Sequence, residues 1–150
     1  MADKREEKSK WPGVSINDED YQIIESLRAK NGPFRGIDRK DAMMIAAAIA
    51  LRNDLPESGN ALLKCNNQII HPSLLNGEGY DTYRQYISLI FFHGKGKKDL
   101  DSMNDTAAMV SNFIDYSHRG LMMLKANYID SNNTTNEELY KEFIEALDRE

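Results

Sequence analysis

Three histidines and one cysteine are the side chains of this 150-residue chain best suited to act as base, nucleophile or metal ligand near neutral pH. His118 follows Asp115 by three residues, so the two share a helix face, as the Glu-x-x-His pairs of di-iron bundles do. A di-iron site needs a second such pair and two more carboxylates, and no second pair is found. We therefore expect a surface contact between Asp115 and His118.

The remaining candidates for metal or nucleophilic chemistry are weaker. Cys65 lies in an apolar segment with no base close in sequence, which is typical of a small buried hydrophobe. One cysteine and three scattered histidines match no standard zinc spacing. The sequence therefore predicts no metal and no other cofactor. A single cysteine also excludes an intramolecular disulfide, and this favours a reducing, cytoplasmic location.

Arg84 and His93 are the candidate pair for an enzyme. Their region loosely resembles the small all-helical ribonucleases of the HEPN type, in which four to six residues separate an arginine from a histidine. Here eight residues intervene. The resemblance implies a metal-independent ribonuclease with Arg84 and His93 as its catalytic residues, and this is one alternative. Overall the sequence favours a protein that is not an enzyme.

The net charge of −5 is distributed unevenly. Residues 130–150 hold 7 of the 24 acidic side chains and 2 of the 19 basic ones, so the rest of the chain is balanced. Two clusters are basic and are candidates for contacts with phosphates or other anions. They comprise Arg28, Lys30, Arg35, Arg39 and Lys40, followed by Lys95, Lys97 and Lys98.

Hydrophobic periodicity predicts a helical protein. Residues 1–14 are polar and form a flexible arm with Trp11 at its base, and residues 15–150 form one domain. Asn17 is the expected N-cap of a first helix that ends at 31–33, and Phe34–Ile37 is a short connector or strand. Residues 61–70 remain ambiguous between helix and strand. The other helices are expected at about 39–52, 80–93, 100–128 and 136–149.

The helix at 39–52 contains ten consecutive apolar residues, from Ala42 to Leu51. A helix that is apolar on every side must be surrounded, so we expect it at the centre of the fold. The longest helix carries Gly120, either as a kink or at a point of close contact, and its wide apolar stripe would provide a homodimer face if one domain cannot cover it. The predicted fold class is all-α, a compact bundle of five or six helices with little or no sheet.

The stretch 34–50 has an aromatic residue and a polar segment, then Lys40-Asp41 and an alanine-rich apolar helix. It is similar to small helical proteins encoded beside DNA phosphorothioation (dnd) systems. Residues 112–128, with Gly120 and Leu124, resemble the second half of such proteins, and the similarity spans about residues 15–145. Where the family pattern has a glycine near the end of the second helix, this chain has Ala50-Leu51. The resemblance implies a non-catalytic accessory role in DNA modification or phage defence.

The sequence as a whole predicts a helical interaction module with a protein partner. The acidic C-terminal helix offers carboxylates to a basic partner, through Glu137, Glu138, Glu142 and Glu145. A DNA-binding regulatory protein is a further alternative, because a basic connector precedes the second helix. That helix lacks the polar outward face that a recognition helix needs, so only its first turn and Arg35 remain for phosphates. Nucleic-acid binding is therefore expected to be weak, and no segment is long enough to cross a membrane.

Overall fold

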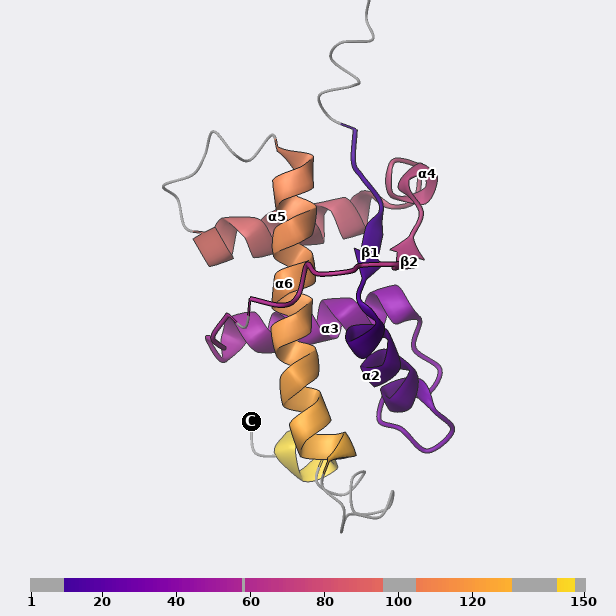
Figure 1. Ribbon diagram of the computed structural model, residues 1–150, viewed down its shortest axis with the longest axis vertical. Coiled ribbons are helices and arrows are strands. Elements are labelled where there is room, and N and C mark those ends of the chain that lie inside the picture. The colour runs from indigo at the N-terminus through magenta and orange to yellow at the C-terminus, as the bar shows by residue number, and fades with distance from the viewer. Residues whose placement is uncertain (1–9, 58, 96–104, 131–142, 148–150) are drawn as a thin grey trace, which may run out of the picture.

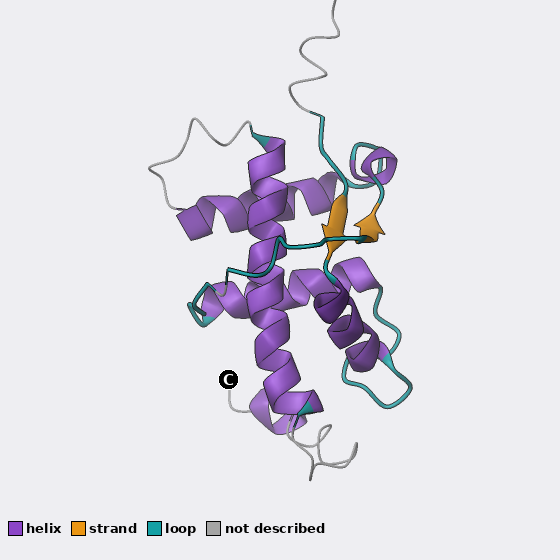
Figure 2. Cartoon of the chain, viewed as in Figure 1, coloured by secondary structure: helices purple, strands orange, loops and turns teal. Residues whose placement is uncertain are grey.

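The computed structural model describes residues 10–57, 59–95, 105–130 and 143–147 (Figure 1). These residues are mostly helical, with one small sheet (Figure 2). The strands are β1 (Val14–Ile16) and β2 (Asn67–Ile70). The helices are α2 (Asp18–Arg28), α3 (Arg39–Arg52), α4 (Pro72–Leu75), α5 (Asp81–Lys95) and α6 (Thr106–Leu124), which continues as the π-helical turn η2 (Lys125–Ile129). Residues 143–147 are also helical.

α6 is the central element of the described fold. It contacts α2, α3, α5 and β1, and it crosses α3 and α5, which lie beside each other (Figure 1). The Tyr83 hydroxyl donates to Asp41 Oδ1 at 3.0 Å, and three residues later the Tyr86 hydroxyl donates to the Met44 carbonyl. The contact moves three residues forward on α5, from Tyr83 to Tyr86, and three residues forward on α3, from Asp41 to Met44. The two helices therefore run in the same direction. The α6 side chains that fill the core are Met109, Val110, Phe113, Ile114, Leu121 and Leu124.

The bounds predicted for the second helix are confirmed, but its predicted central position is wrong. α3 spans Arg39–Arg52 and buries Ala42, Met43, Ala46, Ala47 and Ala50 on one side. Its opposite side is open, with Ile45 and Ala48 exposed. Alanine and an occasional isoleucine are tolerated at a protein surface, so an all-apolar stretch does not require a neighbour on every side. The larger side chains of α6 occupy the centre instead.

The small sheet corrects the expectation of an all-α fold and resolves the ambiguous segment. Residues 61–64 form a turn, and Asn67–Ile70 pairs antiparallel with Val14–Ile16 through Val14 opposite Ile70 and Ile16 opposite Asn67. Ile70 is buried, as are Val14 and Ile16 on the partner strand. Strand pairing here depends on a segment more than fifty residues away, which local periodicity cannot reveal.

The predicted N-cap of the first helix is confirmed, and the alternatives for the connector at 34–37 are resolved. The Asn17 side chain caps α2 by accepting from the Asp20 backbone N–H at 2.7 Å. Asp38 occupies the N-cap position of α3, but its side chain pairs with Lys40 at 2.9 Å instead of capping the backbone. The connector at 34–37 contains a turn and no strand.

The structure describes part of the predicted N-terminal arm and part of the predicted C-terminal helix. The backbone of Trp11, at the base of the expected arm, exchanges two hydrogen bonds of 2.7 Å with the Asn76 side chain, and Trp11 packs against the core. Residues 1–9 and 100–104, and all of the C-terminal helix apart from 143–147, lie outside the described residues.

Candidate functional site

The buried polar residues of the core include a histidine and a carboxylate from different helices. His118 of α6 donates from Nδ1 to Asp20 of α2, with distances of 2.7 and 3.0 Å to its two carboxylate oxygens. His118 is 3% exposed and Asp20 is 1% exposed. The hydrogen bond that His118 donates to Asp20 raises the pKa of His118, and the nearby charges of Glu19 and Asp115 add to the increase, against the effect of burial.

This pair corrects the predicted surface contact between Asp115 and His118. Asp115 instead pairs with Arg119, four residues along the same helix. The Arg119 guanidinium also stacks over the Tyr116 ring, with 4.3 Å between Cζ and the ring centroid. His118 therefore ties α2 to α6 inside the core, where its Nδ1 is already occupied by a protein partner.

Cys65 is half-buried, less than the small buried hydrophobe that the sequence predicts. Its thiol donates to the Ala61 carbonyl at 3.3 Å, and it is partly buried. Burial raises the pKa of the Cys65 thiol, and the negative charge of Asp20 raises it further. A thiol in this environment is a poor nucleophile, because the reactive thiolate is disfavoured. Among residues that the structure places, no three His, Cys, Asp or Glu side chains are grouped so that they could hold a metal ion.

Arg84 and His93, the two residues of the ribonuclease alternative, both lie on α5 but have different environments. Arg84 donates to the carbonyls of Leu75 and Gly77, the latter at 2.9 Å, and pairs with Asp81. These bonds fix the turn that connects α4 to α5. His93 is exposed and packs edge-on against Phe92. His93 follows Arg84 by nine positions, which is about 13 Å along the helix at 1.5 Å per residue, so α5 does not bring the two side chains together.

The first basic cluster is largely neutralised by ion pairs. Arg39 Nε lies 2.6 Å from Glu25 Oε1, and Arg28 Nη1 lies 3.1 Å from the same oxygen. These contacts, with the Arg39 hydrogen bond first, lower the pKa of Glu25. With Lys40 paired to Asp38, only Lys30 and Arg35 of this cluster lack an ion-pair partner within the described chain. Glu25 lies outside the 28–40 segment, so a charge count over that segment missed the neutralising residue.

The second basic cluster and the acidic helix lie mainly outside the described residues. Lys97 and Lys98 are not described, and Lys95 is the last residue of α5. Of the predicted partner-binding carboxylates, Glu137, Glu138 and Glu142 are likewise outside, whereas Glu145 is placed on the helix at 143–147 and is exposed. On that helix Phe143, Ile144 and Leu147 are 38%, 52% and 59% exposed.

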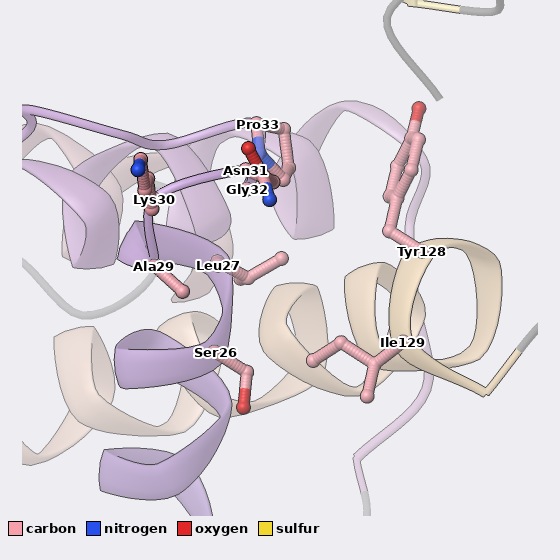
Figure 3. A pocket seen from close by; sticks show the side chains of 9 residues that line it. All are labelled: Ser26, Leu27, Ala29, Lys30, Asn31, Gly32, Pro33, Tyr128 and Ile129. Carbon is pink, nitrogen blue, oxygen red and sulfur yellow. The ribbon is translucent and has the colours of Figure 1, made fainter. Parts of the chain in front are cut away.

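A hollow between α2 and η2 is the feature that sequence analysis missed. Its volume is about 260 Å³. The end of α2 and the segment that follows it form one wall, and the π-helical turn forms the other. The Ile129 side chain points toward Ser26 and Leu27 (Figure 3). The sequence marks residues 31–33 only as the end of a helix and residue 128 only as the end of the longest helix. The lining consists of Ser26, Leu27, Ala29, Lys30, Asn31, Gly32, Pro33, Tyr128 and Ile129.

Where the structure describes it, the apolar stripe of α6 is covered by the rest of the chain. Its main positions are buried, and Met122 is the large hydrophobic residue of α6 that reaches 36% exposure. The sequence predicts a homodimer face on this helix only if one domain cannot cover its apolar stripe. The described residues of α6 do not meet this condition. None of the helices in the described part of the chain is both long and apolar enough to cross a bilayer.

No protein-family model, curated protein or solved structure matches this chain.

Proposed function

We propose that this chain is a non-catalytic helical interaction module and that its acidic C-terminal helix is the element that binds the partner. The observation that carries the proposal is the exposure of Phe143, Ile144 and Leu147 on a helix that also bears Glu145. An amphipathic helix whose apolar side is left uncovered is suited to a complementary groove on another surface. The flanking carboxylates would add selectivity for a basic groove.

The chemistry of the described residues supports binding more than catalysis. The buried histidine is engaged with Asp20, the cysteine thiol is disfavoured as a thiolate, and Arg84 holds a turn. A role as an accessory subunit in DNA modification or phage defence is proposed from the resemblance of residues 34–50 and 112–128 to the dnd-associated proteins.

Co-purification from the native host tests the binding role. Tagged wild-type protein is compared with Ile144→Asp/Leu147→Asp, which places charge on the apolar side of the helix. The matched control is Leu62→Asp/Leu63→Asp, which alters two exposed leucines elsewhere on the surface. We expect a stoichiometric partner with wild type and control, and its loss with the helix variant. Equal retention by all three proteins would contradict the proposed helix.

A phosphate-contacting role is a second candidate, favoured by the two cations without ion-pair partners in the described chain, Lys30 and Arg35. Both are exposed and lie on the segment that follows α2. Two cations support few phosphate contacts, so binding by this route would be weak and strongly salt-dependent.

A further inference from the structure

The hollow between α2 and η2 is suited to an anchoring side chain. Leu27 and Pro33 line one wall and Tyr128 and Ile129 line the other, and the Ile129 side chain points toward Leu27 (Figure 3). Its volume of about 260 Å³ is below the roughly 300–1,000 Å³ of typical small-molecule sites. A cavity of this size and apolar character fits one or two hydrophobic side chains from a protein segment.

The C-terminal helix carries side chains of the required kind. Phe143 and Leu147 are four residues apart and so lie on one face, with Ile144 next to it. All three are exposed, so within the described structure this apolar side and the hollow are both uncovered.

Charge favours the same pairing. Lys30 lies in the lining of the hollow and Arg35 follows nearby in the chain, and neither has an ion-pair partner among the placed residues. The C-terminal segment 130–150 carries a net charge of −5, with Glu142 and Glu145 beside the apolar positions. Basic residues near the cavity and acidic residues flanking the helix are electrostatically complementary.

We propose that the C-terminal helix of one copy inserts its apolar side into the α2–η2 hollow of a second copy, and that the exchange is reciprocal. This inference rests on the proposed function of the C-terminal helix and names its partner. A two-fold dimer of this kind covers both helices and both hollows with two identical contacts. Phe143 follows Asp130 by thirteen positions in the sequence, and a chain of that length spans up to about 45 Å, enough to reach a neighbouring molecule.

Sedimentation equilibrium of the full chain tests the dimer directly. We expect wild type and the control Leu62→Asp to dimerise, and Leu147→Asp to dissociate at least tenfold more readily. Ile129→Asp should have the same effect from the side of the hollow. A monomeric wild type throughout the micromolar range overturns the proposal, as does equal dimerisation of all four proteins.

A charge exchange separates docking between copies from docking within one chain. Lys30→Glu and Glu145→Lys each weaken their own dimer. Mixing the two variants restores a dimer, because each hollow then meets a helix of opposite charge. Docking within a chain predicts monomers that the mixture does not change, and that result would contradict the exchange.

Disulfide trapping tests the same contact without Ile129→Asp, so a loss of folding stability in that variant does not affect the result. In a Cys65→Ser background, the pair Pro33→Cys and Ile144→Cys should oxidise to a linked dimer on a non-reducing gel. A linked monomer would overturn the exchange. If wild type is monomeric but the C-terminal helix still captures a host protein, this inference fails while the proposed function stands.

Discussion

Gly120 of α6 lies directly against the backbone of Ala46 on α3. A Cβ atom added at Gly120 would be 1.8 Å from the Ala46 carbonyl oxygen, so the backbones of the two helices meet at this crossing. The alternatives predicted for Gly120 were a kink or a close contact, and the close contact is confirmed. The alanines of α3 allow this approach because their side chains are small.

Gly120→Ala should therefore destabilise the protein. Intrinsic helix propensity alone would favour alanine by about 1 kcal/mol. The steric conflict acts in the opposite direction, and overpacking costs typically reach about 1–3 kcal/mol, so we expect a net loss of unfolding free energy. Urea unfolding followed by circular dichroism measures it. An increase in stability would show that the two helices do not approach this closely.

The one-sided burial of α3 can be tested at two neighbouring alanines. Ala47→Lys places a charge in the core and should cost several kcal/mol or prevent folding. Ala48→Lys makes the same change at an exposed position and should stay within about 0.5 kcal/mol of wild type. Thermal denaturation of both variants is the measurement. Comparable damage from the two would support a helix surrounded on all sides, as first predicted from the sequence.

The Asp20–His118 pair should make stability depend on pH. The pKa of His118 is raised above its ordinary 6.5 in the folded protein. Its protonation therefore contributes stability that is fully present below pH 6.5 and is lost as the pH rises through the folded pKa. The difference in unfolding free energy between wild type and His118→Gln should shrink over this range.

Replacing Asp20 or His118 should lower the free energy of unfolding at pH values below the folded pKa of His118. Asp20→Asn or His118→Gln leaves a buried polar group without its ionic partner, a change that typically costs about 3–5 kcal/mol. A double-mutant cycle measured at several pH values isolates the coupling between them. A coupling that is independent of pH, or that grows toward alkaline pH, would contradict the raised pKa.

Glu25 should determine how strongly the basic cluster attracts nucleic acid. Glu25→Gln removes the shared ionic partner of Arg28 and Arg39, so both guanidinium groups lose their ion pair, although Arg28 Nε still donates to the Ile37 carbonyl. We expect tighter retention of duplex DNA in mobility-shift assays at low salt, with a salt slope steeper by about 1–2. Glu57→Gln, an equal charge change at an exposed residue, is the control. If the two variants retain DNA equally, only net charge matters and the ion pairs are irrelevant.

Incubation with labelled RNA in the absence of metal tests the ribonuclease alternative. Because Arg84 is held by the turn before α5 and His93 is two to three helical turns away, His93→Ala should leave any cleavage unchanged. Cleavage that disappears in His93→Ala would reverse the proposal of a non-catalytic protein.

The sequence alone determined the features that depend on local periodicity and local backbone chemistry. Apolar spacing predicted the helical class and the bounds of α3, and the Asn17 side chain predicted the start of α2. Each of these signals lies within a few residues of the structure it specifies.

Only the tertiary structure decided which distant groups meet. His118 faces Asp20 across 98 residues of sequence, although Asp115 is the nearer acidic residue on its own helix. Glu25 neutralises Arg39 from 14 residues away, and β1 finds its partner strand beyond two helices. The hollow exists because a π-helical turn brings Ile129 opposite Leu27. Such contacts depend on how helices pack against one another, and helical periodicity specifies which side of a helix is apolar without specifying its neighbour.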